Sequence, residues 1–257
     1  MYTRHTALII RMALTLCAFL FSTVSLAEGA LQLAPLRLVF SSVSIANASN
    51  HSANTATLTV KNRGDTASLV QLEILSWSQK ENEEVLEPTR DILISPPVFT
   101  IAAKSEQTLR AVLRRKPDAN NQLSYRLFVR EVQDQSQPVE PGAIKVLLNI
   151  SIPVFVEPIN KPTANLQSQL KWSAKRVQAN KLHIKLNNAG TQHIQIKSFQ
   201  ISSHDKTIGQ NAMRYALAGS SVEWVIEAKD LPLNTPLLLQ AVTDNGDLRE
   251  TIALEQP

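Results

Sequence analysis

The residues best suited to catalysis are scattered along the chain and form no catalytic pattern. His51, His183, His193 and His204 stand far apart, without the H-x-x-x-H or H-E-x-x-H spacing that brings two imidazoles to one metal ion. The sequence also lacks a G-x-S-x-G nucleophile elbow, a G-x-x-x-x-G-K phosphate loop and a G-x-G-x-x-G turn. We therefore expect no enzymatic activity, no metal and no cofactor, ATP included.

The feature of the sequence that says most about function is a long strand with alternating apolar residues. Every second residue is apolar in one stretch: Ile144, Val146, Leu148, Ile150, Ile152, Val154 and Val156. This alternation predicts a strand over Ala143–Val156 with one apolar face, longer than the usual strand of about 5–6 residues. Pro153 cannot donate a ladder hydrogen bond, which favours a sheet edge. An exposed edge of this kind aggregates unless it captures another strand; an ordinary core strand is the alternative.

The N-terminus has the pattern of a secretory signal peptide. Arg4 and Arg11 precede or flank an apolar stretch, Met12–Val24, and small residues follow up to Ala27. The apolar stretch is too short to span a membrane, and no later stretch approaches about 20 apolar residues. We expect residues 1–27 to be cleaved and the mature protein to work outside the cytoplasm without membrane insertion.

Cleavage at this position changes the composition of the mature protein. It removes two arginines, which lowers the net charge from +4 to +2, and it removes Cys17, the only cysteine. The mature chain therefore has no disulfide and no thiol nucleophile, so its hydrophobic core must stabilise it. No block rich in lysine or arginine indicates nucleic acid as a partner.

Short alternating runs separated by turn residues predict an all-β protein made of two β-sandwiches. The prolines in Glu157–Pro162 indicate a stiff linker, so we expect domains at 28–157 and 158–257. In the first domain we expect strands at Leu31–Phe40, Ala56–Asn62, Ser68–Trp77, Asp91–Ile94, Val98–Ile101, Gln107–Arg114, Leu123–Val132 and Ala143–Val156. In the second we expect strands at Leu170–Trp172, Lys181–Asn187, Ile194–Ser202, Arg214–Leu217, Ser221–Glu227, Leu237–Thr243 and Leu248–Leu254.

Turn chemistry marks the ends of several of these strands. Asn62–Asp65, Asn187–Gly190 and Asp244–Asp247 have the composition of turns, and Glu81–Glu84 is expected to be a hairpin tip rather than a metal site. We find no internal repeat in the sequence.

Several of these segments, in this order, resemble the periplasmic pilus-assembly chaperones of the chaperone–usher pathway. The resemblance covers the mature chain and rests on Ala34–Phe40 (APLRLVF), Ala56–Asn62, Pro96–Ile101, Leu109–Val112, Ser124–Val132 and Ile152–Pro158. The segments YRLFVREV and IPVFVEP are most similar to the archaic branch of the family. The resemblance implies two immunoglobulin-like domains in an L or boomerang arrangement.

It also implies a function and partners. Such chaperones bind pilus or fimbrial subunits that lack their last strand, lend them one, prevent their aggregation and deliver them to an outer-membrane usher in fimbrium biogenesis. The donor strand here would present Ile144, Val146, Leu148, Ile150 and Ile152. The alternative is that some of these side chains, Ile152 above all, lie against the protein's own core. The same edge could also pair with a second copy of the chain.

The resemblance extends to a charged residue that would bind the client, but it fails at a second one. Arg37 matches the arginine that anchors the subunit's C-terminal carboxylate, and a guanidinium suits that bidentate contact. The family's lysine near the end of the donor strand is replaced by Pro153, so a second cation must come from elsewhere, and Arg126 is one candidate beside Arg114 and Lys145.

A second departure concerns the contact between the domains. Glu131 and Asp244 match the two acids of the family's interdomain ion-pair set, but Glu157 stands in the place of its arginine. Either another base, such as Arg130, substitutes, or other contacts join the domains.

The competing class is an exported structural component of a pilus or an adhesin with immunoglobulin-like domains. A pilin would lack its own closing strand and carry an extension near its N-terminus, whereas here the first domain has a full set of strands and the extension-like segment is internal. An exported hydrolase would need polar catalytic clusters, which the sequence does not contain. The sequence thus favours the chaperone.

Overall fold

The fold is known from a computed structural model that describes residues 31–41, 54–133, 146–160, 165–178, 180–211, 213–229, 231 and 236–255. These residues form strands and a single 3-10 turn, η1 (Leu166–Gln169), which confirms the all-β prediction. Within them, no helix is long and apolar enough to cross a membrane. One core is built between Leu31 and Val156 and another between Leu170 and Ile252. The exact domain boundaries at residues 27 and 157 stay predictions.

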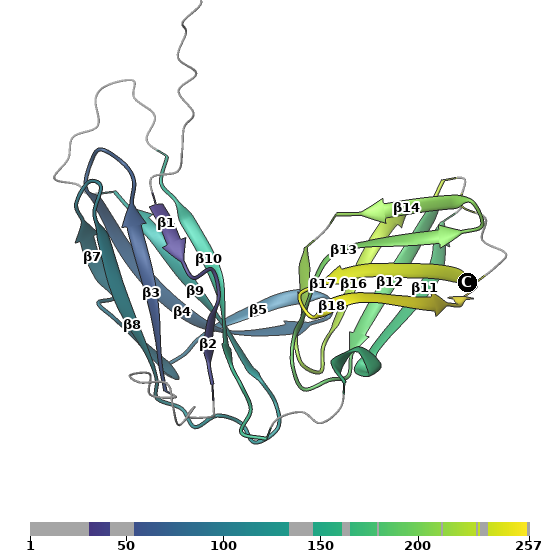
Figure 1. Cartoon of the computed structure of the whole chain (residues 1–257), viewed down its shortest axis with the longest axis horizontal. Helices are drawn as coiled ribbons and strands as arrows, with labels where there is room; N and C mark the ends of the chain where they lie inside the picture. The colour runs from purple at the N-terminus through teal and green to yellow at the C-terminus, as the bar shows by residue number, and fades with distance from the viewer. Residues whose placement is uncertain are drawn as a thin grey trace, which may run out of the picture. The chain divides into compact units, whose positions relative to one another are not determined.

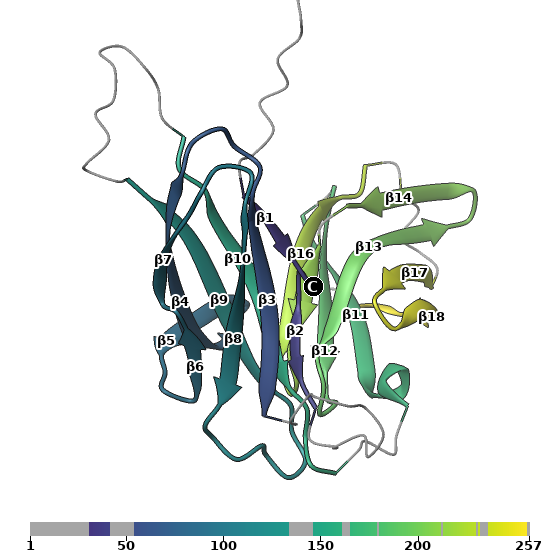
Figure 2. The ribbon, with the colours of Figure 1, turned by 60° about the vertical axis from the view of Figure 1, so that its left-hand side comes forward.

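The first sandwich consists of two sheets, which lie face to face in Figures 1 and 2. The first sheet has the order β1 (Leu31–Ala34), β3 (Thr55–Asn62), β8 (Glu106–Leu113), β6 (Ile92–Ser95). The second has the order β2 (Leu38–Phe40), β10 (Asn149–Val156), β9 (Leu123–Val132), β4 (Ser68–Lys80), β5 (Glu83–Pro88), with β7 (Val98–Ile101) also paired to β4.

The alternation of apolar residues explains how these sheets stack. In β9 the side chains of Tyr125, Leu127 and Val129 are buried, while the residues between them face outward. Leu127 is opposite Ile152 of β10, and Tyr125 is opposite Val154, so the inner row continues from strand to strand. Every second residue of each strand thus enters the same core.

The second sandwich is built in the same way. One sheet has the order β16 (Ser221–Glu227), β12 (Lys181–Asn188), β11 (Leu170–Gln178), β19 (Leu254–Glu255). The other has the order β14 (Lys206–Gln210), β13 (Ile194–Ser203), β17 (Leu237–Thr243), β18 (Gly246–Ile252), with β15 (Arg214–Ala216) also paired to β13. Its core contains Trp172 stacked on Trp224, with ring centroids 5.8 Å apart, and Phe199 edge-on to Trp224.

The structure corrects the sequence prediction at several strands. The stretch Leu31–Phe40 forms two strands in different sheets, because β1 pairs with β3 while β2 pairs in parallel with β10. Strands β5 and β14 were not predicted. The predicted hairpin tip is confirmed, since Glu81 and Asn82 link β4 to β5 with φ of 51° and 69°. Such left-handed pairs fit the twist of a two-residue hairpin.

One local motif occurs in both sandwiches, although the sequence showed no repeat. Asn62 ends β3 and is fully buried; its Nδ2 donates to the carbonyls of Thr66, Ile101 and Ala102, and its Oδ1 accepts from the Gly64 N–H. Asn188 ends β12 and is equally buried. Its side chain bonds the carbonyls of Gln192, Ala216 and Leu217 and the Gly190 N–H. Each asparagine thus fastens the turn after its strand to the opposite sheet.

Candidate functional site

The open part of the second sheet lies along β10. This strand pairs antiparallel with β9 over its whole length, but β2 covers its other side only at Val154–Val156. Among the described residues, no strand pairs with that side from Asn149 to Pro153. The prediction of an edge strand is therefore right for the first half of β10 and wrong for the second.

The predicted apolar row changes from exposed to buried along its length. Val146 is 75% exposed, and Leu148 and Ile150 are partly buried against the first core. Ile152 is 2% exposed, so it belongs to the protein's own core, as the alternative reading had it, and cannot also fill a partner's pocket. The strand begins at Asn149 rather than Ala143, and Ile144 lies outside the described residues.

Glu131 fixes the point where the chain enters β10. Its N–H donates to the carbonyl of Leu148 at 2.8 Å, and its carboxylate accepts from the N–H of Leu148 at 3.3 Å and from the Ser68 hydroxyl at 2.7 Å. Both partners belong to the first sandwich. Glu131, which matches an acid of the family's interdomain set, therefore does not meet Asp244: it lies at the end of β9 opposite Val70, while β4 reaches the second sandwich at its other end, through Gln79. This agrees with the alternative that other contacts join the domains.

Arg37 links the two sandwiches directly. It precedes β2, and its Nη2 donates to Asp244 Oδ2 at 2.9 Å and to Gln195 Oε1 at 3.2 Å. Its side chain remains 34% exposed. Arg37 thus supplies the cation for Asp244 that the sequence left unassigned, whereas Arg130 pairs with Glu73 in its own sheet.

The surroundings of Asp244 keep it charged. Burial alone would raise its pKa, but interactions with His193, with the Gln195 N–H and with Arg37 outweigh burial and lower the pKa to about 2. His193 Nε2 lies 3.5 Å from Asp244 Oδ2, and its imidazole is stacked on Phe155 with ring centroids 3.6 Å apart. Burial lowers the pKa of His193, against the opposing effect of Asp244. The buried imidazole of His193 therefore contacts β10, and the charged carboxylate of Asp244 binds Arg37 just before β2.

Arg126 reaches the place left by the missing lysine. It is directly opposite Pro153 across the β9–β10 pair. Its guanidinium carbon lies 3.8 Å from the ring centroid of Trp77, and its Nη2 donates to Glu84 at 3.0 Å. Its side chain is 14% exposed. Arg126 therefore brings a positive charge beside β10, although Trp77 and Glu84 already hold it.

An aromatic cluster at the contact between the sandwiches was missed by the sequence reasoning. It contains Trp77, Phe155 and Leu217, with Tyr215 and Leu86 packed against them. The position of Phe155 was the available signal, because it is apolar on the strand face opposite the inner row that ends in Val154 and Val156. An apolar residue on the outer face of a strand needs a second partner, which here is the second sandwich.

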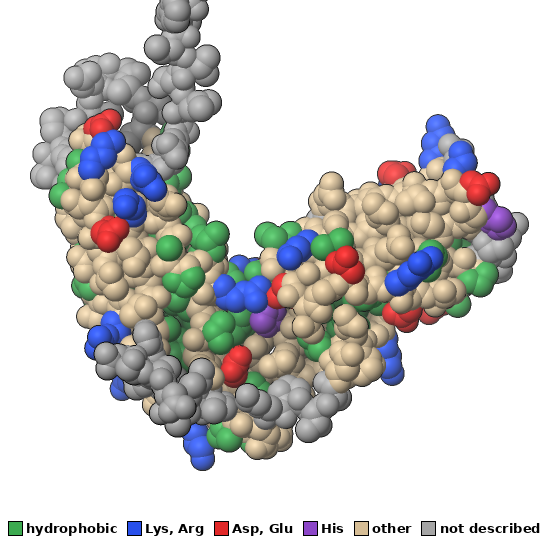
Figure 3. All heavy atoms as spheres, viewed as in Figure 1, with side chains coloured by type: hydrophobic (Ala, Val, Ile, Leu, Met, Phe, Trp, Pro, Cys, Tyr) green, Lys and Arg blue, Asp and Glu red, His purple; other side chains and the backbone are tan. Residues whose placement is uncertain are grey.

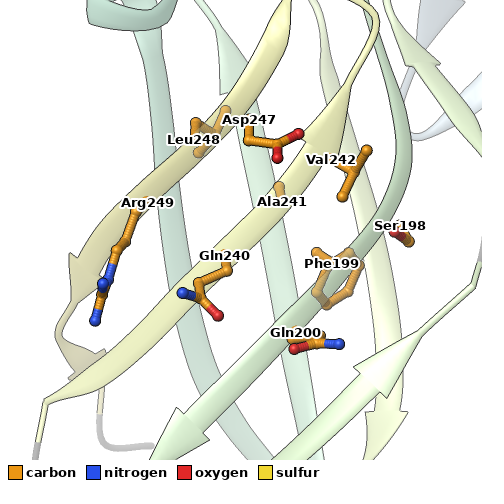
Figure 4. A pocket seen from close by; sticks show the side chains of 9 residues that line it. All are labelled: Ser198, Phe199, Gln200, Gln240, Ala241, Val242, Asp247, Leu248 and Arg249. Carbon is orange, nitrogen blue, oxygen red and sulfur yellow. The ribbon is translucent and has the colours of Figure 1, made fainter.

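Two other surfaces are less informative about function. On the face seen in Figure 3, basic and acidic side chains are interspersed, with no large area of one sign. A hollow crosses β13, β17 and β18, as Figure 4 shows, and contains none of the predicted site residues. It is lined by Ser198, Phe199, Gln200, Gln240, Ala241, Val242, Asp247, Leu248 and Arg249.

Comparison with known families identifies the first sandwich. Residues 41–161 match the model described as the pili and flagellar-assembly chaperone, PapD N-terminal domain. Among curated proteins, none matches the chain.

Solved structures share the fold of nearly the whole chain. One is from the CsuC–CsuE chaperone–tip adhesion subunit pre-assembly complex of the archaic Csu pili of Acinetobacter baumannii, with a TM-score of 0.63, 21% identity, and coverage of 88% of this chain and 99% of that one. Another is from the complex of the Salmonella enterica SafA pilin with the SafB chaperone, with a TM-score of 0.58, 17% identity, and coverage of 88% and 98%. The E. coli chaperone DraB has a TM-score of 0.54 and 22% identity, and the match covers 88% of this chain and 96% of that one. At these identities the likeness establishes two immunoglobulin-like sandwiches.

Proposed function

We propose that the protein is a periplasmic pilus chaperone that holds its clients along the open edge of β10. Residues 41–161 match the N-terminal domain of the pili and flagellar-assembly chaperones, and the chain shares the two-sandwich fold of solved pilus chaperones. The clients are pilus subunits that lack their last strand. The complexes of similar chains with a pilin and with a tip subunit support this class of partner. A structural pilus component is not favoured, because the matched family is one of chaperones.

The observation that carries the proposal is the half-covered edge of β10 with exposed apolar side chains at its open end. A client strand can bond the free main-chain groups there while alternate side chains enter the client's groove. Val146, Leu148 and Ile150 are the described side chains that fit this role, with Ile144 before them in the same row. Full burial of each contributes about 1.5–3 kcal/mol, more than the about 0.5–1.5 kcal/mol of one main-chain bond.

The remaining steps follow from the same function. The signal peptide expected at residues 1–27 would direct export to the periplasm and then be removed. Delivery of the client to an outer-membrane usher completes the cycle. The work comes from client folding and binding, since the sequence carries no phosphate-binding loop for ATP.

Co-purification from periplasm tests this function. We expect the tagged chaperone, expressed with the neighbouring exported genes, to elute with one small β-rich subunit in a one-to-one complex. Isolation of a client-free monomer, or of a self-polymer joined through β10, would contradict the proposal and favour an adhesin or pilin.

Arg37→Ala is expected to weaken client capture about tenfold or more. A charge-assisted hydrogen bond between the guanidinium and the client's terminal carboxylate contributes about 1.5–3 kcal/mol, and each 1.4 kcal/mol corresponds to about tenfold in affinity. The measurement is the client affinity of purified variants by competition with a fluorescent client peptide.

The matched variant Asp244→Asn separates anchoring from domain contact. It retains Arg37 but removes the charge that Arg37 now pairs with at 2.9 Å. Capture should fall much less in Asp244→Asn than in Arg37→Ala, because the amide oxygen can still accept from Arg37 and hold it in place. An equal loss in both variants would show that Arg37 acts only through the contact between the sandwiches.

A further inference from the structure

The hairpin β4–β5 carries two amide side chains onto the second sandwich. Gln79 Nε2 donates to the Tyr215 carbonyl at 2.7 Å. Its Oε1 accepts from the Leu217 N–H at 2.9 Å and from the Ser220 hydroxyl at 2.6 Å. One side chain therefore satisfies a carbonyl and an N–H two residues apart on the same segment.

Asn82, at the tip of the hairpin, makes a second set of contacts. Its Oδ1 accepts from the Glu223 N–H at 2.8 Å, and its carbonyl accepts from Arg214 Nη2 at 3.0 Å. Arg214 Nη1 also donates to the Glu223 carbonyl at 2.7 Å. The left-handed φ of 69° at Asn82 turns these groups toward β16.

These contacts supply hydrogen bonds that a neighbouring strand would otherwise make. β16 is the edge strand of its sheet, so the N–H and carbonyl of Glu223 that point away from β12 have no ladder partner. Such groups are costly when they are covered without a partner. Asn82 and Arg214 supply the partners for Glu223, and Gln79 does the same for Tyr215 and Leu217.

The same hairpin touches the client-binding strand. Trp77 lies two residues before Gln79 and forms the aromatic cluster with Phe155 of β10 and with Leu217. Its ring centroid is 6.2 Å from that of Phe155 and 5.4 Å from that of Tyr215. The hairpin therefore joins β10 to the segment that its amides hold.

We propose that Gln79 and Asn82 are positioning residues, an amide clamp that locks the two sandwiches together and so holds Asp244 within reach of Arg37 beside β10. The clamp takes the place of the interdomain acid–arginine set, since Glu131 bonds within the first sandwich and Glu157 stands where the arginine was expected. Its role in positioning the anchor rests on the proposed chaperone function, but the lock itself does not.

The test compares the wild type with two variants by ¹⁵N relaxation of the client-free protein, which reports a rotational correlation time for each sandwich. Asn82→Gly keeps the left-handed turn but loses Oδ1, and it is combined with Gln79→Ala. Asn82→Asp keeps both the turn and an acceptor for Glu223. Wild type and Asn82→Asp should give one shared correlation time, and the double variant two shorter ones. A single unchanged time in the double variant would overturn the clamp.

A second readout connects the clamp to client binding. Loss of the lock lowers the fraction of molecules with Arg37 and Asp244 in place, so client recovery should fall by about half or more in the double variant and stay at the wild-type level in Asn82→Asp. Unchanged recovery with two correlation times would overturn the positioning role. Because relaxation is measured without a client, failure of strand lending would leave that result intact.

Discussion

Val146→Asp is expected to abolish client recovery from periplasm while the chaperone stays folded. Val146 is 75% exposed in the free protein, so the substitution disturbs no core contact. In the complex the same position would face the client's apolar groove, where an unpaired carboxylate costs several kcal/mol on top of the about 1.5–3 kcal/mol lost with the valine. A loss of about 4 kcal/mol corresponds to roughly a thousandfold in affinity.

Val225→Asp is the matched control for this experiment. It makes the same change at a valine of β16 that is 62% exposed, on the second sandwich. Both variants should unfold at the wild-type temperature, and only Val146→Asp should lose the client. Normal recovery with Val146→Asp, and also with Leu148→Asp, would refute the assignment of the donor row. Equal losses in Val146→Asp and Val225→Asp would point to a general effect of added charge.

Asn62→Ala is expected to destabilise the protein by about 3 kcal/mol or more. The substitution leaves carbonyls of Thr66, Ile101 and Ala102 without their side-chain donor, and a buried polar group without a partner costs about 1–3 kcal/mol. Against a typical total of about 5–15 kcal/mol this is a large loss. Urea unfolding followed by tryptophan fluorescence measures it.

Two further variants help to interpret this result: one changes the donor of Asn62, and the other is a control at an exposed asparagine. Asn62→Asp keeps the acceptor for the Gly64 N–H but removes the donor, so it should be at least as unstable as Asn62→Ala. Asn120→Ala removes an asparagine side chain that is exposed, and it should change stability by less than about 0.5 kcal/mol. If Asn62→Ala were as mild as Asn120→Ala, the buried hydrogen bonds of Asn62 would contribute little to the fold.

The fold could be predicted from local patterns because most strands here carry their own period-two signal. Strands such as Leu123–Val132 have one buried face, and their alternation is enough to place them. β5 could not be predicted, because its residues do not alternate between apolar and polar, none of them is fully buried, and it forms only by pairing with β4. The division of Leu31–Phe40 between two sheets depends on the partners β3 and β10, which the local sequence does not reveal.

The candidate site was predictable only as far as side-chain type and spacing decide it. The alternating row and Arg37 are visible in the sequence, and both lie at β10 or next to it. The exposed fraction of each apolar side chain along β10 was not predictable, because it depends on β2, which covers one half of β10 and leaves the other half open. The partners of Glu131 and Asp244 lie on other segments, and for Asp244 they include Arg37 of the other sandwich, so matching these acids to a family pattern did not identify the groups that they bind.

The uneven burial of β10 has a consequence for the affinity with which a client can be bound. Its second half is fixed between β9 and β2, so the backbone entropy of that part is lost when the chaperone itself folds. A client therefore meets a template that is already extended over Asn149–Val156 and whose entry at Leu148 is held by Glu131. Preorganisation of this kind raises affinity by lowering the entropic cost of association rather than by adding contacts.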